Sequence, residues 1–244
     1  MTTPLGCGAA REDKSAKVSS RQKNRSTVQF KVKKVGVQLM VSHAFVQSIL
    51  RYFRKLESMK TLALETSTPF LCLGWLDASQ RKETILRVER AHAEQLAGQL
   101  EAFLKGLPHA DLIVIGAGPG SYTGLRVAAG FALGLARAWQ ARVVHVPTLE
   151  AIALQASGVV AVSLDAHRGQ VYSAVYLVEP SPKFGLPSIA KVLQPLEKRS
   201  FEAFAALIPK GATHLGDVAP SGIALAQLGL LRLELGAQPD LLYL

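Results

Sequence analysis

The residues best suited to chemistry lie in a glycine-dense segment that reads G-A-G-P-G-S from Gly116 to Ser121. Gly116, Gly118 and Gly120 can adopt φ > 0 without a Cβ clash, and Pro119 stiffens the turn between them. Ser121 can accept a hydrogen bond at the start of a following helix. Backbone N–H groups in such a turn, together with the positive end of a helix dipole, can bind an anion. The segment therefore predicts either a phosphate site or a turn that only packs the helix tightly on a sheet.

Two common nucleotide-binding patterns do not fit this segment. The dinucleotide fingerprint G-x-G-x-x-G requires glycine where this chain has Ser121. The P-loop pattern requires a Gly-Lys-Ser/Thr sequence at the helix start, which this segment lacks. Both motifs are therefore disfavoured.

A second polar segment, Glu65-Thr66-Ser67-Thr68-Pro69, separates two apolar runs. Its hydroxyls can bond local backbone groups, and its proline stops the first run. The segment predicts a hairpin turn, and a ligand role for its side chains is the alternative.

A third polar segment contains Asp165, His167 and Arg168. These residues could form an acid–base set, but turns commonly carry such side chains because water solvates them there. The turn is the favoured interpretation.

A serine hydrolase would need Ser67 or Ser121 as nucleophile and His92 or His167 as base. No spacing in the sequence places a base within reach of either hydroxyl. We therefore predict no catalytic residue.

The elements that position these residues follow from hydrophobic periodicity and turn signals. Strands are predicted at 61–64, 70–76, 81–89, 112–115, 142–146, 159–165, 170–178, 189–193 and 214–216. Helices are predicted at 92–107, 122–139, 149–156, 201–208 and 223–230, with Thr148 as the cap of the third helix.

Two rows of small residues run along the helix after Ser121. One row is Ala128, Ala132 and Ala136, and the other is Gly130, Gly134 and Ala138. Small side chains let another helix approach closely. Two glycines cost up to about 1 kcal/mol each in helix propensity, so we expect a neighbour to use the space.

The charge of the chain is concentrated at its N-terminus. Residues 1–58 contain 12 of the 28 Lys and Arg but only 3 of the 18 Asp and Glu, a net charge of +9 that leaves +1 for residues 59–244. A basic-patch argument for tRNA binding would thus depend on the leading segment alone. Two cysteines, Cys7 and Cys72, are too few for a disulfide framework and suit the reducing cytoplasm.

The N-terminal 58 residues form a basic leader. Residues 1–35 have few large apolar side chains and are predicted to be disordered, whereas residues 35–53 could form a strand or a helix. No secretory signal is evident, and a transit peptide is disfavoured. The charge balance changes at Met59, and we expect the protein to start there.

Three stretches resemble the TsaB (YeaZ) family, and the resemblance covers nearly all of residues 59–244. They are GPGSYTGLRVAAGFALGLA, MKTLALETSTPFLCLGWL from Met59, and VSLDAHRGQVYSAVY, which is similar to a DARR-x-x-VY hairpin of that family. Residues 239–244 are similar to its closing P-x-Y-L segment. The resemblance implies an α/β fold of the actin-like ATPase superfamily. An RNase H-like mixed sheet with helices on both faces would occupy residues 59–157, and a shorter second α/β lobe would occupy 158–244.

That superfamily places an acidic residue at the end of its first strand, where the residue helps to hold a metal–nucleotide. Glu65 has this position, and its side chain is longer than the usual aspartate of the family. The weak phosphate or nucleotide contacts that the resemblance implies are Glu65, Thr66, Ser67, Gly118, Gly120 and Ser121. TsaD-type relatives carry two metal-binding histidines four residues apart, but here Leu96 follows His92 at that spacing, so no metal site is predicted.

The resemblance implies a non-catalytic scaffold that partners a TsaD-type catalytic subunit in threonylcarbamoylation of tRNA. A TsaE-type ATPase and a TsaC-type enzyme would complete the pathway, and ATP or ADP with Mg would belong to the assembly, not to this subunit. The same surface could form a homodimer. The implied interface residues are His92, Leu96, Leu100, Phe103, Tyr122, Arg126, Val127, Gly130 and Gly134. A stand-alone ATPase or glycoprotease-like peptidase is the alternative, and a direct tRNA-binding module is disfavoured.

Overall fold

The computed structural model describes residues 27–31, 38–42, 58–88, 91–180 and 187–234, and contacts divide the chain into Met1–Arg51 and Tyr52–Leu244. In the first unit, β1 (Thr27–Lys31) pairs with β2 (Gln38–Ser42) as an antiparallel hairpin. The prediction of disorder is therefore wrong for Thr27–Lys31, where a partner strand supplies backbone hydrogen bonds. The strand alternative for residues 35–53 is confirmed at Gln38–Ser42. Residues 1–26 and the P-x-Y-L tail lie outside the described residues.

The second unit begins with a five-stranded sheet in the order β5-β4-β3-β6-β7. Its strands are β3 (Thr61–Glu65), β4 (Phe70–Leu76), β5 (Arg81–Arg87), β6 (Leu112–Gly116) and β7 (Arg142–Val146). The first three strands pair antiparallel, and β6 and β7 continue the sheet in parallel with β3. Both β3 and β6 are buried along their whole length, as expected for apolar strands covered on two faces. The predicted mixed sheet is confirmed.

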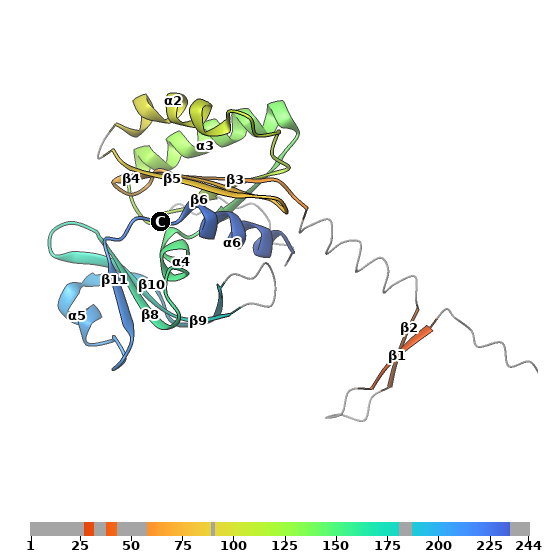
Figure 1. The fold of residues 1–244 in the computed structure, drawn as a ribbon. Coiled ribbons are helices and arrows are strands. Elements are labelled where there is room, and N and C mark those ends of the chain that lie inside the picture. The colour runs from red at the N-terminus through yellow and green to blue at the C-terminus, as the bar shows by residue number, and fades with distance from the viewer. Residues whose placement is uncertain (1–26, 32–37, 43–57, 89–90, 181–186, 235–244) are drawn as a thin grey trace, which may run out of the picture. The chain divides into compact units, whose positions relative to one another are not determined.

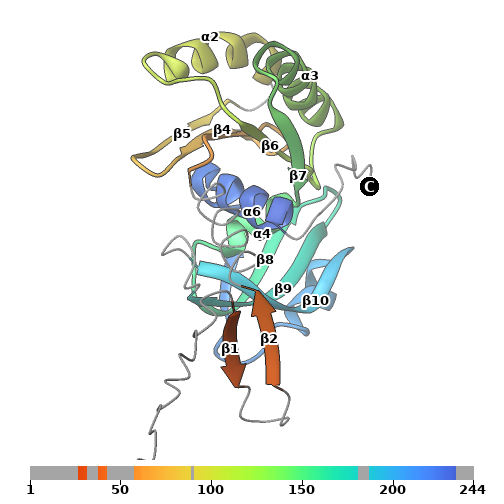
Figure 2. The same ribbon diagram turned by 90° about the vertical axis from the view of Figure 1, so that its right-hand side faces the viewer.

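Helices cover both faces of this sheet. On one face lie α2 (His92–Leu104) and α3 (Tyr122–Trp139), and on the other lie α4 (Thr148–Ala153) and α6 (Gly222–Glu234) (Figure 2). The apolar stripe of α2 packs with Ala128 and Ala132 of α3 against the sheet. The first row of small residues in α3 therefore faces the core of this chain.

A second, four-stranded sheet follows in the order β10-β9-β8-β11 (Figure 1). Its strands are β8 (Gly158–Asp165), β9 (Gln170–Pro180), β10 (Pro187–Ser200) and β11 (Thr213–Gly216). As in the first sheet, three consecutive strands pair antiparallel and the next strand is parallel to the first of them. Strand β10 is much longer than the predicted 189–193, because it pairs with β9 through three register shifts that sequence alone does not reveal. The short helix α5 (Phe201–Ala205) packs Phe204 against Ala161 and Val175.

Helix α6 packs beside the first sheet, although sequence order assigns it to the second lobe. One apolar core contains side chains of both sheets together with α4 and α6. Gly222 at the start of α6 lies so close to Gly74 of β4 that a Cβ on either glycine would meet the other's backbone. The proposed lobe boundary at residue 158 therefore separates sequence halves that share a core. None of the helices in the described ranges is long and apolar enough to cross a membrane.

Candidate functional site

The glycine motif packs against the loop that follows β3. The last residue of β3 and the first two of the loop each face a glycine so closely that a Cβ would overlap with them: Glu65 faces Gly116, Thr66 faces Gly124 and Ser67 faces Gly120. Only Gly118 of the three turn glycines has a positive φ, of 83°. Gly116 and Gly120 are therefore needed for space and not, as the sequence suggested, for a left-handed backbone.

The Glu65 carboxyl lies at the centre of this contact and has no exposure to solvent. The Ser67 N–H donates to Oε1 over 2.5 Å, and the Thr148 hydroxyl lies 2.5 Å from Oε2. Burial raises the pKa of Glu65 above its ordinary value, although the hydrogen bonds from Ser67 and Thr148 and the charge of His92 act to lower the pKa. The neutral form of the carboxyl is thereby favoured.

Two donors of the glycine turn are used inside the protein. The Gly118 N–H donates to Thr148 Oγ1 over 3.1 Å, and the Ser121 N–H donates to the Ser67 carbonyl over 2.6 Å. Ser121 caps α3 as predicted, since its Oγ accepts from the Gly124 N–H over 3.2 Å. Thr148 does not cap α4, because its hydroxyl is committed to Glu65 and Gly118.

This geometry does not fit a metal–nucleotide held by Glu65. Both of its carboxyl oxygens are engaged in the interior, and the two N–H groups named above are occupied. The described residues contain no group of three or more His, Cys, Asp or Glu side chains that could hold a metal ion. Ser67, Gly120 and Ser121 do line a cleft, so a contact between them and a phosphate stays a prediction.

The cleft has a volume of about 600 Å³ and lies between the two halves of the second unit. Its lining includes Ser67, Thr68, His92, Gly120 and Ser121 from the first half and Asp165, His167, Tyr172 and Asp217 from the second. No lysine or arginine of the described residues lines it. With two carboxylates and no strong cation, the wall favours neither a phosphate nor any other polyanion.

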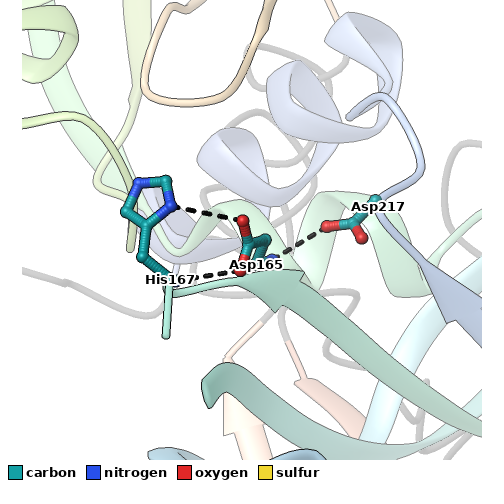
Figure 3. Close-up of polar contacts among 3 residues, drawn as sticks. All are labelled: Asp165, His167 and Asp217. Atoms are coloured by element: carbon teal, nitrogen blue, oxygen red, sulfur yellow. Dashed lines mark hydrogen bonds and ion pairs between the residues drawn. The ribbon is translucent and has the colours of Figure 1, made fainter. Parts of the chain in front are cut away.

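The polar residues of the second half bond one another (Figure 3). The Asp165 N–H donates to the Asp217 carboxylate over 2.8 Å, and the His167 N–H donates to Asp165 Oδ1 over 2.8 Å. The His167 ring nitrogen lies 3.3 Å from the other Asp165 oxygen, and His167 and Arg168 have φ values of 62° and 57°. These bonds stabilise an exposed turn, which agrees with the favoured interpretation of the segment.

The serine–histidine pairs that a serine hydrolase would need do not form among the described contacts. Ser121 Oγ accepts from a helix N–H, Ser67 Oγ lies 3.3 Å from a threonine hydroxyl, and His92 Nε2 lies 3.2 Å from the Phe70 carbonyl. The structure instead pairs Ser163 Oγ with His214 Nε2 at 2.9 Å. Sequence reasoning missed this pair, because only the pairing of β8 with β11 brings the two residues together.

The predicted partner interface divides into buried and exposed residues. The α2 members, His92, Leu96, Leu100 and Phe103, are buried in the core of this chain. These four predictions are corrected: periodicity marked an apolar stripe, and the sheet of the same chain covers it.

The α3 members lie on the surface. Gly130 and Gly134 are exposed, and no atom of the residues that the structure describes lies within 4 Å of an added Cβ. A shallow groove of about 500 Å³ is lined by Ala93, Arg126, Val127, Gly130, Phe131, Gly134 and Leu135. Tyr122 and Leu133 are 58% and 59% exposed, and the Arg126 guanidinium lies 5.5 Å from the centre of the Tyr122 ring.

Comparisons with known proteins agree with this architecture. The TsaD family model, described as tRNA N6-adenosine threonylcarbamoyltransferase, matches residues 86–226, more than half of the chain. The protein named tRNA threonylcarbamoyladenosine biosynthesis protein TsaB of Haemophilus influenzae is 32% identical over 127 residues, 48% of this chain and 53% of that protein. An uncharacterized protein of Mycobacterium bovis is 38% identical over 122 residues, 47% of this chain and 58% of that protein. The matched region thus spans little more than half the length of these curated relatives.

Solved structures match over a longer stretch. YeaZ from Pseudomonas aeruginosa superposes with a TM-score of 0.62 at 23% identity, over 76% of this chain and all of that one. A second structure, of an uncharacterized protein with similarity to peptidase YeaZ, gives a TM-score of 0.59 at 25% identity, over 73% of this chain and 93% of the other. The predicted α/β fold is therefore confirmed. The chain belongs to the TsaD family.

Proposed function

We propose that this chain is a non-catalytic scaffold subunit that binds and activates a TsaD-type catalytic subunit. The assembly would attach the threonylcarbamoyl group to the adenosine beside the anticodon in tRNAs that read codons starting with A. The names of the TsaB relatives from Haemophilus influenzae and Bacillus subtilis support a part in this biosynthesis.

The observation that carries the proposal is the exposed face of α3. Two helix-interior glycines are open to solvent, although each costs about 1 kcal/mol in helix propensity relative to alanine. Large apolar side chains, Tyr122 and Leu133, lie exposed on the same helix. Glycine rows allow close helix–helix packing, and exposed apolar side chains beside a groove are typical of interaction sites.

The interior chemistry supports a role without catalysis. The Glu65 carboxyl is sealed, and the two candidate nucleophiles bond to groups other than histidine. The alternative, a stand-alone ATPase or peptidase, would show turnover by the purified chain that a Glu65→Ala change abolishes. We expect no turnover above background.

The remaining partners follow from the same proposal. A TsaE-type ATPase and tRNA would join through the complex, with ATP or ADP and Mg bound by the assembly and no cofactor required by this subunit. The α3 surface could also pair with itself when the catalytic subunit is absent. We place the protein in the cytoplasm, where tRNA is modified.

The first experiment blocks the glycine row. Gly130→Leu and Gly134→Leu fill open surface, so the monomer should fold while the groove is closed to a partner. Gly98→Leu is the matched control, because Gly98 is an exposed glycine in α2 with the same open surroundings and does not line the groove. Size-exclusion chromatography with a TsaD-type subunit should show a complex for the control and for the unchanged chain only. A complex that persists with both groove variants would reject this interface.

A further inference from the structure

Three segments that are distant in sequence meet at one carboxyl group. Glu65 ends β3, Thr148 begins α4, and Gly118 lies in the turn between β6 and α3. The Thr148 hydroxyl contacts Glu65 Oε2 at 2.5 Å and accepts from the Gly118 N–H at 3.1 Å, while its own N–H donates to the Gly118 carbonyl at 2.8 Å. The carboxyl therefore fastens the turn to α4 through one side chain.

The same loop also fastens the first turn of α3. The Ser67 N–H donates to Glu65 Oε1, and the Ser67 carbonyl accepts from the Ser121 N–H at 2.6 Å. The Thr66 hydroxyl donates to the Gly124 carbonyl at 2.7 Å. The start of α3 is thus held on two sides by residues adjacent to Glu65.

The held turn leads directly into the proposed partner surface. Tyr122 is the first residue of α3, and Arg126 lies one helical turn later beside its ring. The 18-residue helix continues from there past Gly130 and Gly134. A helix is stiff, so a small rotation at its first turn would displace the whole face.

We propose that Glu65 is a positioning residue for this face: its buried carboxyl locks the glycine turn and the start of α4, and thereby sets the orientation of α3 toward its partner. The inference rests on the proposed function. It explains why the glycine motif of this chain faces a loop of the same chain, with no room between them for a Cβ on Gly116, Gly120 or Gly124.

Burial favours the neutral form of the Glu65 carboxyl, whereas the hydrogen bonds from Ser67 and Thr148 favour the ionised form. The charge of His92 of α2 acts on Glu65, and Glu65 in turn acts on the Cys72 thiol, which lies opposite it on β4. Strand β6 and the turn at 117–121 contribute no titratable side chain, and Glu150 of α4 is paired with Arg232. No lysine or arginine side chain in the described hydrogen bonds and ion pairs reaches Glu65, so ionisation at high pH would place a buried charge in the lock without a strong cation beside it.

The test compares binding of a TsaD-type subunit by the full chain and three variants. Glutamine has the shape of the neutral acid: its Oε1 can accept from the Ser67 N–H, and its amide can donate to Thr148. We therefore expect Glu65→Gln to bind within about twofold of the unchanged chain at pH 6, and to lose less affinity than that chain as the pH rises to 9. Thr148→Val and Glu65→Ala should weaken binding by roughly tenfold or more.

A control separates positioning from stability. Glu150→Gln breaks the ion pair of α4 with Arg232 and leaves the turn intact, so it should lower thermal stability without a comparable loss of affinity. If Glu65→Ala does not fold, the affinity of Thr148→Val and the pH dependence of Glu65→Gln still test whether Glu65 positions α3. Unchanged affinity in Thr148→Val, or the same pH dependence in Glu65→Gln and the unchanged chain, overturns the inference alone. If the unchanged chain binds no TsaD-type subunit at any pH, the proposed function fails and the inference fails with it.

Discussion

At the scale of single residues, the buried carboxyl of Glu65 packs against the glycine turn, the most distinctive motif of the sequence. The sequence presents Glu65 and the glycine turn as two halves of an anion site. In the structure the carboxyl fills the space that Gly116 leaves by having no Cβ. The two features are therefore complementary surfaces of one internal contact.

The raised pKa of Glu65 gives a prediction for stability against pH. The folded state binds the proton more tightly than the unfolded state, in which the pKa is near 4.5. The contribution of this group is therefore complete below that pH and is lost as pH rises toward the folded-state pKa. In that window the unfolding free energy should fall by up to about 1.4 kcal/mol per pH unit relative to Glu65→Gln.

Urea unfolding at several pH values between 5 and 9 measures this difference. The curves of the unchanged chain and of Glu65→Gln should diverge with rising pH, with glutamine the more stable. A constant difference between the two proteins would show that Glu65 does not carry the effect.

At the scale of elements, α3 has one face that is packed against this chain and one that is open. Ala128 and Ala132 pack on the sheet, whereas Gly130 and Gly134 face open space. Near the start of the same helix, Gly124 touches the Thr66 carbonyl. Glycine is thus required at position 124 for space, whereas at positions 130 and 134 no described residue lies close enough to exclude a side chain.

This contrast predicts opposite effects for one substitution in one helix. Gly124→Ala should destabilise the protein by about 1–3 kcal/mol, because its Cβ would overlap with the backbone carbonyl of Thr66, a residue whose hydroxyl is hydrogen-bonded to the Gly124 carbonyl. Gly134→Ala should stabilise it by up to about 1 kcal/mol, because alanine has the higher helix propensity. Denaturant unfolding of both variants measures the signs. Equal effects would mean that the packing of α3 on the loop is looser than described.

At the scale of the whole molecule, the two sheets share one core. Helices α4 and α6 lie between them, and their apolar residues contact strands of both (Figure 2). Arg232 of α6 pairs with Glu150 of α4 at 2.8 Å, which ties the shared layer together. We therefore propose that the second unit folds as a single cooperative structure, although its sequence divides into two lobes.

A fragment of residues 59–157 tests this cooperativity. It keeps the first sheet but lacks α6, so the apolar face that α6 covers would meet water. The fragment should show no cooperative thermal transition by circular dichroism, whereas residues 59–234 should show one. A cooperative transition in the short fragment would mean that the first lobe is independent.

The sequence by itself determined the elements and their order. Apolar runs of strand length, turn residues and the period of α2 locate most of the elements in the second unit, because these signals are local in the chain. The resemblance in residues 59–244 then indicated the topology of the sheet. The cap at Ser121 was also local, since it needs only the three residues that follow.

Only the tertiary structure decided what covers each surface. Periodicity showed that Leu96 and Leu100 share an apolar face, but not that the chain's own sheet buries it. Turn chemistry allowed Thr148 to cap a helix, but Glu65, 83 residues earlier, takes its hydroxyl. The glycine motif allowed an anion, but the space beside Gly116, Gly120 and Gly124 is filled by a segment from another strand. These outcomes depend on contacts between segments that are distant in sequence, and a local sequence pattern does not indicate which distant segment will pack against it.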